Sequence, residues 1–210
     1  MSESESENVG RVVAALRAGE LVVMPTDTVY GLAATAYSEE AASRLYRLKG
    51  RGEIRPTAIV SASVDLLLEC VPELRSLAGG IVRTLLPGPY TLVLPNPARR
   101  FGWLNGNRPD TIGVRVPLVS GPSRDVLEQV GALVATSANL VGGADPRRLA
   151  DVPEGILAGV TATLDGGELP GIPSTVIDFS GVEPVVLRDG AANAAEALAR
   201  VAAHRILTPQ

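Results

Sequence analysis

The sequence has one histidine and one cysteine, and each scarcity excludes a class of chemistry. Its single histidine, His204, lies six residues from the end of the chain, where it is badly placed to activate a serine or cysteine nucleophile. One histidine and one cysteine cannot build the usual four-ligand zinc site. Cys70 has no partner for an internal disulfide, which favours a reducing compartment, and we expect a cytoplasmic location.

Aromatic residues, positive charge and long apolar runs are also scarce. The aromatic content of 3% and the formal net charge of −4 argue against broad nucleic-acid binding through stacking and a basic surface. No apolar run reaches the roughly 18 residues of a membrane-spanning helix, so we expect no membrane association. The opening segment MSESESENVG lacks the basic and apolar regions of a secretory signal, and residues 1–8 are expected to form a disordered tail.

The rest of the chain, residues 9–210, is predicted to be a single domain, because it has no internal repeat or low-complexity linker. Apolar spacing predicts helices at 9–19, 39–49, 63–70, 72–86, 121–130 and 191–203. Short apolar segments predict strands at 21–24, 57–61, 91–94, 112–116, 132–136, 161–164, 175–179 and 184–187. Several strands follow one another without a helix between them, which favours an α/β protein of the α+β type with a mixed sheet and helices on its faces.

Standard nucleotide-binding signatures are missing. There is no Walker A sequence, and the glycines at 50 and 52 begin a G-x-G that lacks its third glycine and follows a helix instead of a strand. Any phosphate must therefore be held by side chains and scattered backbone amides.

The segment PTDTVYGLAA, residues 25–34, places polar groups directly after a buried strand. Thr26, Asp27 and Thr28 can then reach a cleft while the strand holds them still, which suits recognition of a small polar substrate. The alternative is a helix start capped by Thr26 or Asp27.

A group of cations follows the helix at 39–49. Lys49, the only lysine in the sequence, is separated by one glycine from Arg51, and Arg55 lies four residues on. Arginine offers a fork for phosphate and lysine a mobile point charge, so this loop resembles an anion clamp. A helix C-terminus that carries cations for its dipole is the alternative.

Two further segments combine a strand with polar groups. Strand alternation puts Thr111, Gly113 and Arg115 on one face, and a charge flanked by isoleucine and valine needs a partner or a ligand unless the strand is an exposed edge. Ser137 and Asn139 follow the apolar strand at 132–136 and offer donors and acceptors, although an ordinary turn would use the same residues.

The last such segment is PSTVID at 173–178, followed by VVLRDGA. Ser174 opens one strand, and Arg188 closes the next before a glycine turn. Together the segments supply cations, hydroxyls and amides but few acids, bases or nucleophiles. That inventory suits a reaction driven by positioning and charge neutralisation, such as phosphoryl or nucleotidyl transfer.

The order of these segments resembles the YrdC-like family of threonylcarbamoyl-AMP synthases over about residues 9 to 200. The chain carries, in the family's order, PTDTVYGL, KGR, LLPGPYTLVLP, TIGVRVP, TSANLVG, PSTVIDFSG and VVLRDGA. The family's K-x-R and S-x-N signatures are Lys49 with Arg51 and Ser137 with Asn139. The resemblance implies a twisted mixed sheet around a concave, basic cavity.

By that resemblance, the chain forms threonylcarbamoyl-AMP and pyrophosphate from L-threonine, bicarbonate and ATP. The residues expected to contact L-threonine are Thr28, Arg115, Ser137 and Ser174. Those expected to contact ATP are Lys49, Arg51, Arg55, Thr111, Asn139, Arg147 and Arg188, with Lys49 and Arg51 as the catalytic pair. Arg55 stands at a family asparagine and Arg147 at a family hydroxyl residue, so both positions depart from the pattern.

The resemblance also implies a set of partners. Mg²⁺ would accompany ATP and bridge its phosphates. The product would pass to a tRNA threonylcarbamoyl-transferase, and a weak contact with RNA is expected. Two alternatives stay open at this point: a family member that handles another carbamoyl acceptor, as the altered loop at 52–61 suggests, and a non-catalytic RNA-binding module.

Overall fold

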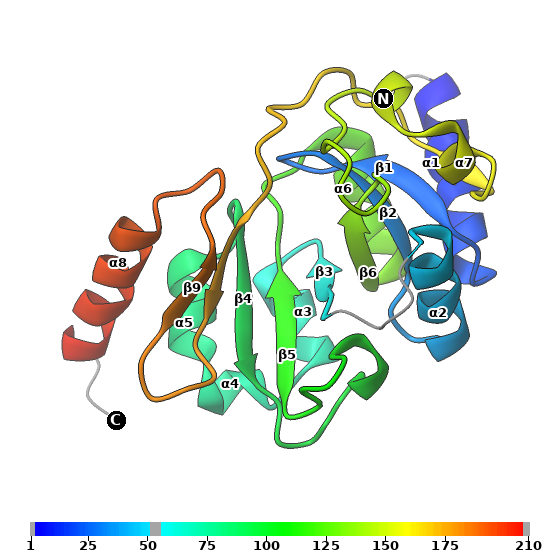
Figure 1. Ribbon diagram of the computed structural model, residues 1–210. Helices are drawn as coiled ribbons and strands as arrows, with labels where there is room; N and C mark the ends of the chain where they lie inside the picture. The colour runs from blue at the N-terminus through cyan, green and yellow to red at the C-terminus, as the bar shows by residue number, and fades with distance from the viewer. Residues whose placement is uncertain (1–2, 51–55, 208–210) are drawn as a thin grey trace.

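The computed structural model describes residues 3–50 and 56–207, and it is built around one nine-stranded sheet (Figure 1). The strands are β1 Val22–Pro25, β2 Tyr30–Thr35, β3 Ala58–Ser61, β4 Tyr90–Pro95, β5 Thr111–Arg115, β6 Ala132–Ser137, β7 Ala162–Thr163, β8 Thr175–Asp178 and β9 Val185–Arg188. They lie in the order β7-β1-β2-β6-β3-β5-β4-β8-β9. The pairs β1/β7, β3/β5 and β4/β8 are parallel and the others antiparallel, which confirms the predicted mixed sheet.

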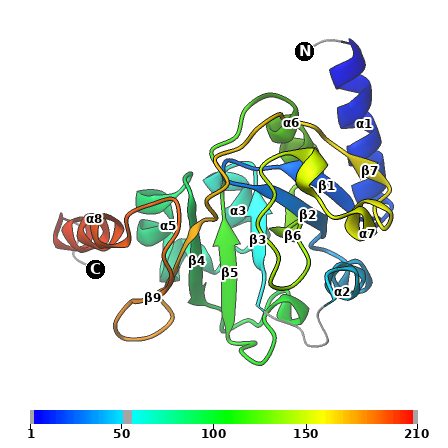
Figure 2. The same ribbon diagram turned by 45° about the horizontal axis from the view of Figure 1, so that its top comes forward.

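Helices cover the sheet unequally. They are α1 Glu3–Arg17, α2 Glu39–Leu48, α3 Val64–Cys70, α4 Leu74–Leu77, α5 Gly79–Leu85, α6 Gly121–Val130, α7 Glu154–Leu157 and α8 Ala194–Leu207, with 3₁₀ turns η1 Gly102–Leu104 and η2 Leu149–Asp151. Figure 2 shows α5 and α8 together beside the β4–β9 end and α1 and α7 beside the β1–β7 end. The two ends of the sheet are thus buttressed by different helices.

The strands at the centre of the sheet alternate as period-2 geometry requires. In β4, Leu92 and Leu94 are fully buried in the core shared with α3, α4 and α5, while Thr91 and Val93 face the other way. On that second face, α1 and α6 bury a separate apolar cluster against β1, β2 and β6. The part of the same face formed by β3, β5, β4 and β8 lines a cavity instead.

One strand of the structure is missing from the sequence predictions. Residues Tyr30–Thr35 form β2, which pairs antiparallel with β1 through Met24 and Gly31. The alternative reading of Thr26 or Asp27 as the cap of a helix is therefore wrong, because both lie in the turn of a hairpin. The first five residues of the run YGLAAT are all buried because β2 is an interior strand, and the run consequently shows no alternation.

Three helices also differ from their predicted limits, and the last of them, predicted at 191–203, is α8 Ala194–Leu207. The first begins at Glu3, so residues 3–8, assigned to a disordered tail, are helical; Glu3 and Glu5 occupy the first turn, where the helix dipole favours negative charge. The helix predicted at 72–86 is two helices, because the backbone leaves the helical region at Ala78. Among the described helices, none is both long and apolar enough to span a bilayer.

The packing of β4 makes a stability prediction. Leu92→Ala should lower the free energy of unfolding by about 2–5 kcal/mol, because Leu92 is 0% exposed and its loss leaves a cavity in the core. Urea denaturation followed by circular dichroism measures this. The matched change Leu118→Ala, at a side chain that is 69% exposed, should alter stability by less than about 0.5 kcal/mol. Similar losses in both variants would contradict the placement of β4.

Candidate functional site

The cavity on the open face of the sheet has a volume of about 290 Å³. Hydroxyl side chains line it from several strand ends, and the set comprises Thr26, Thr57, Thr91, Thr111, Thr136, Ser137 and Ser174. Arg115 and Arg188 are the charged groups among the described lining residues, which include no carboxylate. The wall therefore offers hydrogen-bond donors and positive charge to a small ligand.

Arg115, at the end of β5, is fixed from the β1–β2 turn. Its Nη2 donates to Asp27 Oδ1 and, over 2.8 Å, to Thr28 Oγ1. The Asp27 Oδ2 in turn accepts from the backbone N–H of Leu118 at 2.9 Å. The Arg115 and Asp27 side chains are only 11% and 9% exposed, so the pair is held largely out of water. This contact explains why a charge can sit in a strand flanked by apolar residues.

Arg115 still has unused hydrogen-bonding capacity. Its Nε is buried and, within the described residues, has no hydrogen-bond partner. Because a guanidinium carries five donors, the Asp27 and Thr28 contacts leave part of the fork available for a ligand. Thr28 is fully buried behind Arg115 and orients the guanidinium from there.

Lys49 joins the end of α2 to the end of β6. It is 2% exposed, and its Nζ donates to the backbone O of Ser137, to Ser137 Oγ at 3.2 Å and to Asn139 Oδ1 at 2.6 Å. Asn139 is held by its own bond from Nδ2 to the Gly143 carbonyl at 2.6 Å. The K-x-R and S-x-N segments, which are about 90 residues apart, thus meet in space at this ammonium.

The burial of Lys49 argues against the helix-dipole alternative for its segment, while its role in an anion clamp stays a prediction. A cation that only complements a helix dipole would stay in solvent, whereas this one turns inward to β6. The other two cations of the predicted clamp, Arg51 and Arg55, lie outside the described residues. Their assignment to ATP stays a prediction.

Ser174 and Arg188 form a second polar cluster, at the β8–β9 side of the cavity. Arg188 donates from Nε and Nη2 to the Ser174 carbonyl at 3.0 and 2.8 Å, and from Nη2 to Ser174 Oγ at 3.1 Å. Arg188 is exposed as a residue, yet partial desolvation of its guanidinium lowers its pKa, and the charge of nearby Arg115 acts in the same direction while Asp145 opposes it. Two cations that repel each other across a cavity favour an anion between them.

The predicted ATP contact Thr111 is present in the cavity wall. It is 4% exposed, and its Oγ1 donates to the Arg108 carbonyl at 2.9 Å. Arg108 is itself held by Asp178, at 2.7 Å from Nη1 to Oδ2. The predicted alternation holds, because Gly113 and Arg115 line the same wall.

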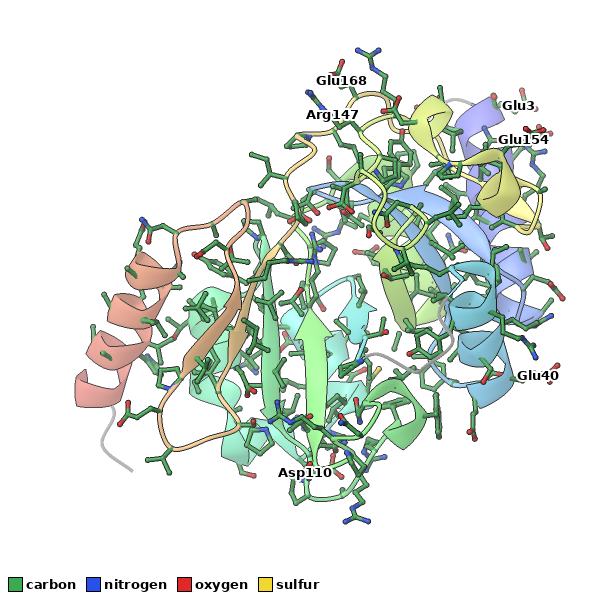
Figure 3. The ribbon with its side chains drawn as sticks, in the orientation of Figure 1. Glu3, Glu40, Asp110, Arg147, Glu154 and Glu168 are labelled. Atoms are coloured by element: carbon green, nitrogen blue, oxygen red, sulfur yellow. The ribbon has the colours of Figure 1, made fainter. Side chains whose placement is uncertain are left out.

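Arg147 is not brought to this cavity wall. Its Nη2 pairs with Glu168 Oε1 at 2.8 Å, and its Nε donates to the Leu169 carbonyl at 3.2 Å. Figure 3 shows Arg147 and Glu168 together on the outer loops, away from the sheet. Arg147 is not among the described residues that line the cavity, and its assignment to ATP stays a prediction.

Sequence reasoning missed two contributors to the site. Asp27, expected either to reach a cleft or to cap a helix, is the counter-ion of Arg115. Thr91 lies in the quoted segment LLPGPYTLVLP but received no role, although its hydroxyl is 2.8 Å from Ser174 Oγ. The alternation of β4 would have placed Thr91 on the face opposite Leu92, but which face is the cavity wall follows only from the tertiary structure.

A protein-family model for Sua5, YciO and YrdC proteins, described as telomere recombination, matches residues 14–190. The chain belongs to the Sua5/YciO/YrdC family. The matched range includes the site residues described above, namely Thr28, Lys49, Arg115, Ser137, Ser174 and Arg188.

Known members of the Sua5/YciO/YrdC family resemble the chain over most of its length. A threonylcarbamoyl-AMP synthase of Pyrococcus abyssi is 36% identical over 176 residues, which are 83% of this chain and 52% of that protein. A putative threonylcarbamoyl-AMP synthase of Mycobacterium tuberculosis is 33% identical over 90% of this chain and 86% of that protein. The crystal structure of P. abyssi Sua5 complexed with L-threonine has a TM-score of 0.77 and 32% identity, covering 94% of this chain and 57% of that one. The chain therefore spans about half the length of its P. abyssi relative.

Gly190 allows a close backbone approach that fixes Ser174. A Cβ at Gly190 would lie 2.3 Å from the Pro173 carbonyl oxygen and 2.5 Å from the Ser174 carbonyl carbon. The Ala191 N–H donates to the same Pro173 carbonyl at 2.8 Å. Glycine after Arg188–Asp189 is thus required so that the turn can press against the Ser174 backbone.

Replacing Gly190 by alanine should therefore destabilise the protein. The new methyl group collides with backbone atoms that cannot move aside as a flexible side chain would, and overpacking of this kind costs about 1–3 kcal/mol. We expect Gly190→Ala to lower the thermal midpoint by several degrees, measured by differential scanning calorimetry. Gly181→Ala is the control, since its Cβ would come no closer than 3.6 Å to the nearest atom. A midpoint unchanged in both variants would refute the close approach.

Proposed function

We propose that the chain is an L-threonylcarbamoyladenylate synthase, a nucleotidyltransferase that uses L-threonine, bicarbonate and ATP. The observation that carries the proposal is one cavity wall in which Arg115 and Arg188 stand among hydroxyls on or beside six strands, one of which, Ser137, is bonded by the buried Lys49. Membership in the Sua5/YciO/YrdC family and the L-threonine complex of P. abyssi Sua5 support the same conclusion.

The amino acid would occupy the side of the cavity where Arg115 lies. A carboxylate suits the free part of the Arg115 fork, because charge-assisted bonds to guanidinium are short and directional. Asp27 and Thr28 keep the fork oriented, so the ligand does not have to order it. Ser137 and Ser174, the other two residues expected at L-threonine, also line the cavity.

ATP would bind where Lys49 and Asn139 meet Ser137 at the end of β6, with Thr111 and Arg188 of the cavity wall as further contacts. Arg51 and Arg55, which lie outside the described residues, are proposed to contact it as well. Lys49 and Arg188 would neutralise charge on the phosphates, where preorganised cations act most strongly because water is excluded. No group of three or more histidine, cysteine, aspartate or glutamate side chains among the described residues is arranged to hold a metal ion. Mg²⁺ would therefore enter with ATP as part of the substrate.

The proposed reaction has two steps. The amino nitrogen of L-threonine adds to the carbon derived from bicarbonate, which gives N-carboxy-threonine. A carbamate oxygen then attacks the α-phosphorus of ATP, the bond from that phosphorus to the bridging oxygen breaks, and pyrophosphate leaves with the electron pair. The cavity wall supplies positioning and positive charge for this transfer, and it needs no protein nucleophile.

The product would be consumed by a tRNA threonylcarbamoyl-transferase in the cytoplasm, with at most a weak contact between this chain and RNA. A mixed anhydride of a carbamate and a phosphate is prone to hydrolysis, so a prompt transfer to the next protein would protect it.

Pyrophosphate release from ATP tests the proposal. We expect release that requires both L-threonine and bicarbonate, with L-serine as the matched control amino acid giving at least several-fold less, since a single methyl group is worth about 10-fold or somewhat more in a shaped pocket. Release that ignores L-threonine would favour a family member with another carbamoyl acceptor. Absence of release together with salt-sensitive RNA binding would favour the RNA-binding module.

Lys49→Ala should reduce turnover by at least about 100-fold, because it removes the buried ammonium that would neutralise phosphate charge. Arg51→Ala should have an effect of the same kind. The control is Arg47→Ala, which removes an exposed cation two residues before Lys49 on α2. Circular dichroism checks that each variant is folded. Wild-type rates in folded Lys49→Ala and Arg51→Ala proteins would refute the phosphate-clamp assignment.

A further inference from the structure

The hydroxyl of Thr91 occupies a position in the cavity that no predicted contact explains. Thr91 lies on β4, lines the cavity and is half-buried, whereas Ser174 beside it is only 1% exposed. The two hydroxyl oxygens are 2.8 Å apart. Within the described residues, Ser174 is the only hydrogen-bond partner of the Thr91 side chain.

The direction of the hydrogen bonds follows from Arg188. A guanidinium can only donate, so Ser174 Oγ accepts from Arg188 Nη2 at 3.1 Å. If Thr91 also donated to Ser174, the Ser174 proton would be a buried donor without an acceptor, which is unfavourable. Ser174 therefore donates to Thr91, and the bonds run in one direction, from Arg188 through Ser174 to Thr91.

The last proton of this relay points into the cavity. The Thr91 oxygen accepts from Ser174, so its own hydrogen is available to an acceptor on the cavity side. Hydrogen bonds in a chain polarise one another, and a cation at the start of the chain makes the final hydroxyl a stronger donor. The relay thus presents Thr91 to a ligand atom that accepts, most favourably an anionic oxygen.

The neighbouring strand identifies where that oxygen would lie. In the antiparallel β4–β5 pair Leu92 stands opposite Val114. The next position of the register therefore sets Thr91, one residue before Leu92, opposite Arg115, one residue after Val114. Both residues line the cavity, and directly opposed side chains on one sheet face are in reach of a common partner. The geometry therefore brings a single strong donor and the free part of a guanidinium fork to the same subsite.

We propose that Thr91 is a substrate-binding residue that donates to the carboxylate of the amino-acid substrate, next to Arg115, and that Ser174 acts on the ligand through Thr91. This inference rests on the proposed function and deepens it. The most accessible hydroxyl of the relay, that of Thr91, contacts the ligand, and Ser174 and Arg188 orient this hydroxyl.

Calorimetric titration of L-threonine and of ATP, each alone, tests the ligand contact. We expect Thr91→Val to weaken L-threonine binding roughly 10- to 100-fold, the loss typical of a hydrogen bond to a charged group, with ATP binding within about 2-fold of wild type. Thr91→Ser keeps the hydroxyl and should restore L-threonine binding to within about 3-fold. Thr163→Val, on β7 at the far edge of the sheet, is the control and should leave both affinities unchanged.

A second ligand identifies the accepting group. L-threoninamide lacks the carboxylate, so the Thr91→Val change should weaken its binding much less than that of L-threonine. An equal loss for the amide, an equal loss for ATP, no loss for L-threonine, or no rescue by Thr91→Ser would each overturn the assignment.

A measurement without ligand tests the relay separately from the proposed function. Thr91→Val and Ser174→Ala should each lower the thermal midpoint by about 2–4 °C, and the double variant by clearly less than their sum, because both remove the same bond. Additive shifts would overturn the relay. If the wild-type protein failed to bind L-threonine while the shifts were non-additive, the proposed function and the ligand contact would fall, but the relay would stand.

Discussion

The site depends on cations that are buried in the protein and must be paired there. Taking a charge out of water costs several kcal/mol even after relaxation, so each such group has to be surrounded by acceptors that offset the cost. Lys49 meets this constraint with the oxygens of Ser137 and Asn139, and Arg115 meets it with Asp27 and Thr28. Each pairing ties two distant parts of the chain together, and one member of each, Ser137 and Arg115, lines the cavity.

The polar side chains of the cavity wall explain why part of one sheet face has no helix over it. α1 and α6 cover β1, β2 and β6 on that face, while the wall formed by β3, β5, β4 and β8 carries hydroxyls and arginines that an apolar helix could not cover without leaving them unsatisfied. On the opposite face, Leu92, Leu94, Ile112 and Val114 are fully buried in the main core. The strands are thus apolar toward the helices and polar toward the ligand.

Hydrogen bonds within the cavity wall fix the orientation of its polar side chains. Arg188 holds Ser174 through both its carbonyl and its hydroxyl, and Gly190 lets the following turn press on the same backbone. Arg108 holds Thr111 from the other side. A wall whose polar groups are already oriented loses little entropy when a ligand binds, and it can stabilise charge in a transition state without reorganising.

The sequence by itself determined the mixed architecture, most strand positions and the segments that form the site. Alternation in TIGVR and the apolar run before Ser137 are local patterns, so they could be read without a fold. The sequence did not reveal β2, because an interior strand buried on both faces has no alternation. It also did not reveal that the first helix starts at Glu3. Only the tertiary structure decided which side chains meet: Lys49 with Asn139, Asp27 with Arg115, Thr91 with Ser174, and Arg147 with Glu168 away from the cavity. These contacts join residues that are in most cases more than 80 positions apart, and such pairings depend on strand order and register, which no local pattern records.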